Sequence, residues 1–302
     1  MQRKVLSIIL TFVLTLTMGV TSFAASDDSS SEVIESFTIN EYDVIKELRV
    51  KSDRDLVKNG YNKEQIKELK SDSYEKDLLK RAQLSDSELK SNYNYSEEQI
   101  EILRSYKGTP IEETPEMRLL AATCTPTVSV LAYSTASMTI KLAWNWSTLP
   151  SMIVSDIAAV RWQGTDTAGN PLNVALSNNT SYSYCNVNYV YLAGGAAAQS
   201  IKSALSVTDA YGKASKTFAM TKITNGQIDQ WAKSGELRIK VDKTGTALIK
   251  EVAICYSYGH QTIAGNPTVS WPSGFSISFN SVVSKMFTET KRISNTGVIT
   301  SY

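Results

Sequence analysis

The sequence predicts an all-β C-terminal domain, an antiparallel β-sandwich of immunoglobulin-like or related type, preceded by a short α-helical segment. Three observations support this class. Apolar and polar residues alternate along stretches of residues 125–302, turn-forming residues separate these stretches, and capped amphipathic patterns fill residues 25–106. All five tryptophans follow residue 143, so the larger core belongs to the β domain.

Residues 1–24 predict a secretory signal peptide. Arg3 and Lys4 precede an apolar stretch, and Ser22 and Ala24 place small residues at a cleavage site. The alternative is an uncleaved membrane anchor. We therefore expect a secreted, extracellular protein, and the Lys-rich composition is typical of a Gram-positive bacterium of low GC content.

The two parts of the chain carry opposite charge. Residues 27–120 hold 22 acidic and 15 basic side chains, a net of −7, whereas residues 121–302 hold 8 and 14, a net of +6. We expect an acidic helical pro-like segment (residues 25–106), a linker (107–124) in which prolines interrupt regular structure, and a basic β-sandwich domain (125–302). The acidic segment is a predicted partner of the basic domain.

Three capping boxes predict helix starts in the acidic part. Asn62 with Gln65, Ser96 with Gln99, and Ser85 with Glu88 have the spacing in which each side chain bonds the other residue's backbone N–H. The stretches "YNKEQIKELK" (61–70) and "YSEEQIEILR" (95–104) also repeat, which puts an isoleucine and a leucine on one face of each helix.

The β domain shows period-two alternation in "ELRIKVDK" (236–243), "FSISF" (275–279) and "KLAWNWS" (141–147). Only "NGQIDQWAKSGE" (225–236) indicates a helix there.

Little in the sequence predicts chemistry. The only histidine, His260, lies five residues after Cys255, so a regular strand places the two on opposite faces. One histidine and three scattered cysteines have no metal-ligand spacing. No phosphate loop or dinucleotide fingerprint occurs. We expect no catalytic residues, no metal, no cofactor and no nucleic-acid partner. A hydrolase would have to use scattered carboxylates such as Asp156, and we keep it as the second alternative function.

Three cysteines in an exported protein permit one disulfide. Cys185 with Cys255 is the pair we prefer, because both lie in predicted core strands; the alternative is that all three thiols are reduced and buried.

Rows of aromatic residues are the candidate binding sites. Such rows can stack on sugar rings or lie in a lipid interface, whereas the alternative is cross-strand packing in the core. The rows are Tyr256, Tyr258 and His260; Tyr182 and Tyr184; and Tyr189 and Tyr191.

Residues 189–207, "YVYLAGGAAAQSIKSALSV", are small, apolar and nearly uncharged. They could form a membrane-crossing hairpin, or only a Gly/Ala-rich loop joining two core strands.

This layout, together with the ending "YGH…NPTVSW…SISF", resembles the large, heat-labile secreted bacteriocins of bacilli of the geobacillin type. The resemblance implies the killing of related Gram-positive cells and transfers no catalytic residue. We therefore expect a secreted, non-enzymatic effector of the cell envelope, made as a precursor, that meets an anionic envelope, a membrane or wall glycan. The first alternative is an extracellular carbohydrate- or wall-binding module.

Overall fold

The computed structural model describes residues 32–151, 154–263 and 265–302. Residues 31–302 form one compact unit. The predicted signal peptide lies outside the described residues. Among the helices that are described, none is both long and apolar enough to span a bilayer.

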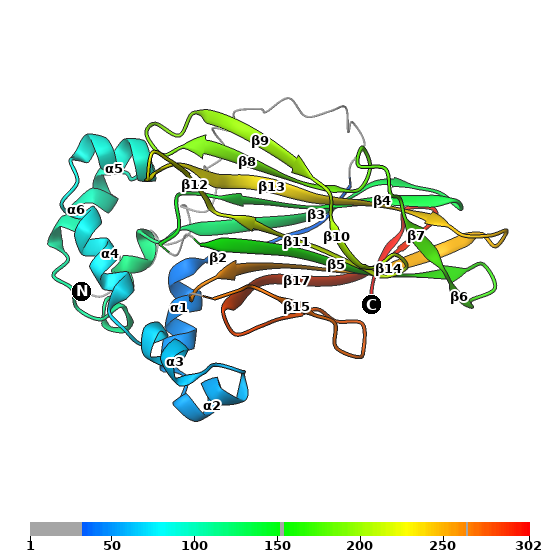
Figure 1. Ribbon diagram of the computed structural model, residues 1–302, viewed down its shortest axis with the longest axis horizontal. Coiled ribbons are helices and arrows are strands. Elements are labelled where there is room, and N and C mark those ends of the chain that lie inside the picture. Colours follow the sequence, from blue (N-terminus) through cyan, green and yellow to red (C-terminus); the bar gives the residue numbers. More distant parts are fainter. Residues whose placement is uncertain (1–31, 152–153, 264) are drawn as a thin grey trace, which may run out of the picture. The chain divides into compact units, whose positions relative to one another are not determined.

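Two antiparallel sheets pack face to face, which confirms the predicted fold class (Figure 1). The nine-stranded sheet has the order β1-β3-β4-β13-β8-β9, with three short strands attached. Its strands are β1 (Glu32–Ser36), β2 (Ile39–Asn40), β3 (Thr123–Tyr133), β4 (Ser137–Trp146), β7 (Val174–Leu176), β8 (Tyr184–Tyr191), β9 (Ala197–Ser203), β12 (Thr221–Thr224) and β13 (Gln227–Lys243).

The seven-stranded sheet has the order β10-β11-β5-β14-β17-β18, with β6 attached to β5. Its strands are β5 (Ser155–Asp166), β6 (Pro171–Leu172), β10 (Ser206–Asp209), β11 (Lys213–Ala219), β14 (Ile249–Gln261), β17 (Val283–Ser294) and β18 (Ile299–Ser301). A small hairpin of β15 (Val269–Ser270) and β16 (Ser278–Phe279) completes the β structure.

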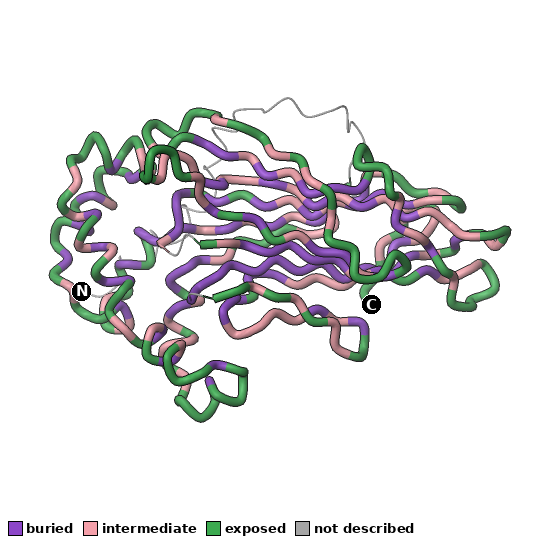
Figure 2. The backbone as a smooth tube through the Cα atoms, viewed as in Figure 1, coloured by how far each residue is buried: buried purple, intermediate pink, exposed green. Residues whose placement is uncertain are grey.

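The main core lies between the two large sheets. The alternation read from the sequence supplies it: Leu237, Ile239 and Val241 of β13 are fully buried, as are Leu142 and Trp146 of β4. Buried residues run along the middle strands of both sheets (Figure 2).

The helices form an insert between β2 and β3, which we call the helical insert (residues 41–122). Ile39 pairs with Cys124 and Asn40 with Thr123, so the chain leaves the sheet and returns to it at adjacent positions. The helices of the insert are α1 (Glu41–Val50), α2 (Asp53–Lys58), α3 (Lys63–Leu69), α4 (Ser73–Arg81), α5 (Asp86–Tyr93), α6 (Glu97–Ser105) and the 3₁₀ turns η1 (Ile111–Glu113) and η2 (Pro115–Leu119).

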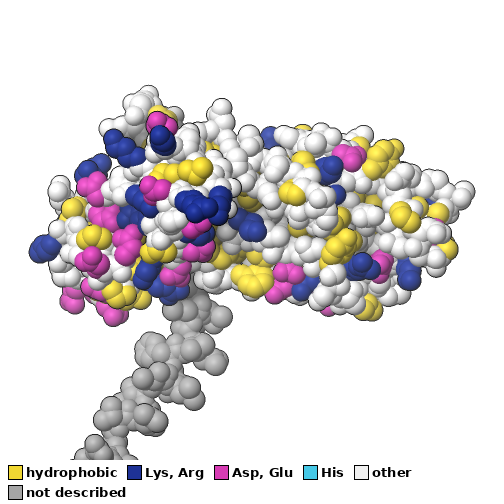
Figure 3. Space-filling model, turned by 90° about the horizontal axis from the view of Figure 1, so that it is seen from below, with side chains coloured by type: hydrophobic (Ala, Val, Ile, Leu, Met, Phe, Trp, Pro, Cys, Tyr) yellow, Lys and Arg dark blue, Asp and Glu magenta, His cyan; other side chains and the backbone are white. Residues whose placement is uncertain are grey.

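All three predicted capping boxes are present, at the starts of α3, α5 and α6. Their apolar faces pack in different places. Ile100 and Leu103 of α6 lie in a core formed within the insert, whereas Ile66 and Leu69 of α3 pack with Ile263 of the sandwich. Charged side chains gather over the helical end of the molecule, and the sandwich in the same view is mainly uncharged (Figure 3).

One local prediction was wrong, and one proline lies inside a strand. Residues 225–236 are not helical: Asn225 and Gly226, with φ of 52° and 80°, form the two-residue turn that joins β12 to β13. Positive φ at both positions is what a tight hairpin turn of this kind requires. Pro126 lies inside β3, and the gap between β1 and β2 falls opposite it, where Phe37 N–H donates to the Pro126 carbonyl. Because proline has no N–H, the ladder is interrupted there rather than ended.

Candidate functional site

The sandwich holds a buried histidine paired with an aspartate. His260 on β14 lies directly opposite Asp156 on β5 in the strand register. His260 Nδ1 is 2.6 Å from Asp156 Oδ1, and both side chains are 0% exposed. The pairing register of β5 and β14 therefore brings His260 and Asp156 together, since residues opposite each other in an antiparallel sheet have adjacent side chains.

The helical insert brings a second carboxylate to the same imidazole. Glu41, the first residue of α1, places Oε1 3.8 Å from His260 Nε2 and is 1% exposed. Its two oxygens also accept the Ser151 backbone N–H, at 2.9 and 3.1 Å. The imidazole thus lies between one carboxylate from the sandwich and one from the insert.

Aromatic side chains complete the shell around Asp156. The Tyr258 hydroxyl donates to Asp156 Oδ2, and Trp146 Nε1 donates to the same hydroxyl oxygen at 3.1 Å. The Trp146 ring also lies 5.0 Å from the His260 ring. Burial, reinforced by Asp156, raises the pKa of Tyr258 well above its usual value, so Tyr258 stays a neutral donor.

The electrostatics hold His260 in its charged form. Burial by itself would lower the pKa of His260, but the carboxylates of Asp156 and then Glu41 outweigh it and raise the pKa to about 10. At neutral pH the site therefore contains an imidazolium enclosed by carboxyl groups. We call Glu41, His260, Asp156, Tyr258 and Trp146 the junction network.

The junction network continues into the insert through Ser151. Arg81 of α4, which is 3% exposed, donates from Nη2 to Ser151 Oγ at 2.9 Å and from Nη1 to the Tyr95 hydroxyl at 3.1 Å. The Tyr95 hydroxyl in turn donates to the Leu120 carbonyl at 2.9 Å. A continuous set of buried and partly buried polar contacts therefore joins α4, the α5–α6 connection and the junction network.

The junction network is buried and therefore lacks the solvent access that an open active site needs. His260 has no exposed surface, and Cys255 lies on the other face of its strand, in a cluster with Phe275 and Ile277. Burial, and to a smaller extent the charge of Asp156, raises the pKa of Cys124 well above its usual value. Cys124 therefore stays a protonated thiol. The arrangement can hold a charge, but it offers no activated nucleophile.

The predicted disulfide is not formed: all three cysteines are free and buried. Cys185 of β8 points into the core between the sheets, whereas Cys255 of β14 points to the opposite face of its own sheet. The alternative prediction, three reduced and buried thiols, describes the structure.

Most of the candidate aromatic binding residues are buried or covered. Tyr256, Tyr258 and His260 do share a face of β14, but that face is the core and each is 0% exposed. Tyr184 and Tyr189 are also buried. Tyr182 and Tyr191 alone among the candidates are exposed, at 44% and 45%.

Lysines lie over several of the tyrosine rings on and beside β8. Lys202 Nζ is 3.8 Å from the centroid of Tyr184, Lys240 Nζ is 4.9 Å from that of Tyr182, and Lys222 Nζ is 5.0 Å from that of Tyr189. These ammonium groups occupy ring faces that a sugar would need.

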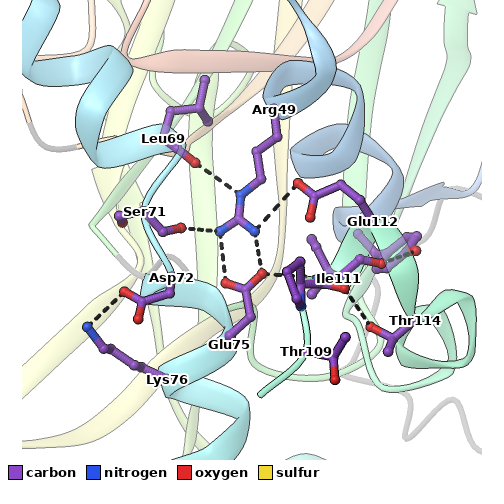
Figure 4. Close-up of polar contacts among 12 residues, drawn as sticks. Arg49, Leu69, Ser71, Asp72, Glu75, Lys76, Thr109, Ile111, Glu112 and Thr114 are labelled. Carbon is purple, nitrogen blue, oxygen red and sulfur yellow. Dashed lines mark hydrogen bonds and ion pairs between the residues drawn. The ribbon is translucent and has the colours of Figure 1, made fainter. Parts of the chain in front are cut away.

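A second buried charge pair lies within the helical insert, and the sequence analysis did not identify it (Figure 4). Arg49 of α1 donates to Glu75 at 2.5 and 3.0 Å, and to the carbonyls of Leu69 and Ser71 at 3.0 and 2.6 Å. These bonds fix the ends of α1 and α3 to α4. A hollow of about 290 Å³ beside Arg49 is lined by residues of both charges, including Lys70, Asp72 and Glu112.

Sequence reasoning singled out His260 and missed its partners. Asp156 was one of eight scattered acids, and Glu41 reads as an ordinary first-turn acid after the cap residue Asn40. Asp166 and Asp209, two of the other acids, lie in turns, where they accept backbone N–H groups. Among the described residues, no group of three or more His, Cys, Asp or Glu side chains could hold a metal ion.

Comparisons with known proteins assign no family. No family model matches the chain, and no curated protein matches it. Solved structures with partial similarity include a Clostridium perfringens delta-toxin (11% identity over 60% of this chain and 88% of that one, TM-score 0.21). Another is AvmM, which catalyses macrocyclization in alchivemycin A biosynthesis (7% identity over 54% of this chain and 82% of that one, TM-score 0.26). A third is the KRT10-binding region domain of the pneumococcal serine-rich repeat protein PsrP (11% identity over 46% of this chain and 76% of that one, TM-score 0.21). TM-scores this low carry no argument about function.

Proposed function

We propose that this protein is a secreted, non-enzymatic effector of the cell envelope, made as a precursor in which the helical insert is held on the β-sandwich by the junction network. The observation that carries the proposal is the buried His260 between Glu41 of the insert and Asp156 of the sandwich. Burying ions costs several kcal/mol each, and apolar residues would stabilise such a junction as well. A charged junction makes sense where one defined docking geometry, and its later release, is required.

The environment of the candidate residues favours this function over the two alternatives. A carbohydrate-binding module needs open aromatic faces, yet β14 buries its row and lysines cover rings beside β8. A hydrolase using paired carboxylates needs access, yet Asp156 and Glu41 are both buried. The opposite net charges of the two parts of the chain also favour a docked precursor.

The first test is to cut the chain within the helical insert, after its last α-helix. A site for a sequence-specific protease placed after the exposed Lys107 would separate α1–α6 from β3 onward. Cut and uncut protein are then compared for lysis of Gram-positive cells, for dye leakage from liposomes and for pull-down with purified wall. We expect the cut protein to be more active. Equal activity before and after cutting would show that the insert is a permanent part of the effector.

Release after cutting should depend on Glu41. The cut piece is still paired to β3 through β1 and β2, so we expect it to leave the sandwich slowly after cutting. Glu41→Gln removes the charge that faces His260 and should speed dissociation in size-exclusion chromatography. Glu47→Gln is the matched control, because Glu47 lies on the same helix, is 71% exposed and pairs only with Lys51 among the ion pairs seen in the described residues. Equal release by both variants would contradict the role of the junction network.

A further inference from the structure

We propose that two neighbouring hairpin tips of the nine-stranded sheet form a surface that binds an anionic lipid bilayer. The tip surface consists of residues 191–197, at the β8–β9 turn, and residues 223–228, at the β12–β13 turn. This inference rests on the proposed envelope function and names the partner for it.

The strand register places the two tips side by side. Tyr191 of β8 pairs with Gln230 of β13, and the Leu192 N–H donates to the Asp229 carbonyl at 2.8 Å. One step further along β13, Ile228 pairs with Ile223 of β12. Both tips therefore project from the same end of the sheet, on strands that are directly hydrogen-bonded.

The tip surface is exposed, apolar and uncharged. Residues 189–201 and 223–228 contain no acidic or basic residue. Ile223 is 67% exposed and Tyr191 is 45% exposed, and the turn between β8 and β9 adds exposed alanines and two glycines. Single exposed apolar residues are ordinary, but an uncharged group of them on adjacent turns is typical of a contact surface. Tyrosine with an apolar ring and a polar tip favours the membrane–water interface.

Two lysines flank the β12–β13 tip. Lys222 and Lys233 lie on either side of it in sequence, and Lys222 Nζ is 5.0 Å from the ring centroid of Tyr189, two residues before Tyr191. The acid next to the uncharged stretch 223–228 is Asp229. One carboxylate oxygen of Asp229, Oδ1, is buried, so less of its negative charge faces an approaching membrane surface. Apolar tips flanked by basic side chains complement a bilayer with anionic headgroups, where each nearby lysine adds attraction. Both tips are turns at strand ends, and neither hollow found in the described residues is lined by them, so a bilayer interface suits them better than a peptide does.

The test measures co-sedimentation of residues 31–302 with vesicles of phosphatidylcholine alone and of phosphatidylcholine mixed with phosphatidylglycerol. We expect binding to the mixed vesicles. Ile223→Asp should weaken it roughly tenfold or more, because an inserted isoleucine is replaced by a charge. Lys222→Gln should weaken it about fivefold and reduce its salt dependence. Circular dichroism and the unfolding midpoint check that each variant keeps the fold.

Val298→Asp is the matched control. Val298 is 60% exposed and also lies in a hairpin turn, between β17 and β18. That turn is at the other end of the sandwich, because Asn295 N–H donates to Lys250 at the start of β14, whereas His260 near the end of β14 meets the insert. The control should bind vesicles like the parent protein. Equal loss in both variants, or no binding to mixed vesicles, would overturn the inference.

A parallel measurement on Gram-positive cells and purified wall separates this inference from the proposed function. If Ile223→Asp abolishes vesicle binding and cell association together, both are supported. If the parent acts on cells but binds wall and not vesicles, the tip surface is wrong and the envelope function stands. If the parent associates with neither cells, wall nor vesicles, before or after cutting, both fail.

Discussion

Strands β14 and β8 carry the same two-residue spacing of aromatic residues, and the fold gives them opposite surroundings. β14 lies between β5 and β17 in the middle of its sheet, its inner face meets the core, and its outer face is covered by the segment that holds Phe275 and Ile277. β8 is next to the edge strand β9, and its outer face stays near solvent. Alternation thus tells which residues share a face, but the neighbours of the strand decide whether that face is covered.

The largest effect should come from removing the buried carboxylate. Asp156→Asn leaves the His260 imidazolium without its closest partner, and breaking such a buried pair costs about 3–5 kcal/mol. Glu236→Gln is the counterpart beside β8, since Glu236 accepts the Tyr184 hydroxyl at 2.7 Å but its side chain is 27% exposed. We expect it to cost no more than about 1 kcal/mol. Urea unfolding at neutral pH measures both, and similar losses would contradict the contrast between the strands.

The second effect is a loss of stability as the pH rises. The pKa of His260 is raised from 6.5 to about 10 in the folded protein, so its contribution is complete below pH 6.5 and is lost as the pH approaches 10. Between these values stability should fall by about 1.4 kcal/mol per pH unit.

Unfolding measurements from pH 7 to 9 test this dependence. Above that range the buried thiols add a loss of the same sign, because burial raises their pKa in the folded chain only. Glu41→Gln removes one of the charges that raise the pKa of His260 in the folded protein, so the decline should still begin near pH 6.5 but end at lower pH. A stability independent of pH across this range would mean that His260 is neutral.

A smaller effect separates two tyrosines on the same buried row. Tyr258→Phe removes the donor to Asp156 and the acceptor for Trp146, and it should cost about 1–3 kcal/mol. Tyr256→Phe should be neutral or slightly stabilising, because the Tyr256 hydroxyl is buried and has no hydrogen-bond partner among the described residues. Both rings are 0% exposed, so packing is matched. If thermal unfolding showed a larger loss of stability for Tyr256→Phe than for Tyr258→Phe, the hydrogen bonds assigned to the Tyr258 hydroxyl would be wrong.

Local chemistry made some features predictable and left others out of reach. Capping boxes depend on residues three apart, so Asn62, Ser85 and Ser96 marked helix starts correctly. The Asn225–Gly226 pair carried a hairpin signal, but the helix-like spacing after it obscured β13. The junction network joins Glu41, Asp156 and His260 through strand register and insert docking, which sequence spacing does not encode.

The smallest effect tests a lysine that covers a tyrosine on β8. Lys202→Met keeps most of the side-chain stem and removes the ammonium group that lies 3.8 Å from the centroid of Tyr184. A cation–ring contact made by an exposed lysine such as Lys202 contributes about 0.5–1 kcal/mol, so urea unfolding should show a loss of that size, and Lys250→Met on an exposed part of β14 should show less. The same variant uncovers a ring face. If sugar binding by a panel of wall glycans rises in Lys202→Met, then Tyr184 is a latent stacking surface, and the difference between β8 and β14 has a functional meaning. If neither stability nor binding changes, the lysine merely rests on the ring, and the difference between the strands is one of burial alone.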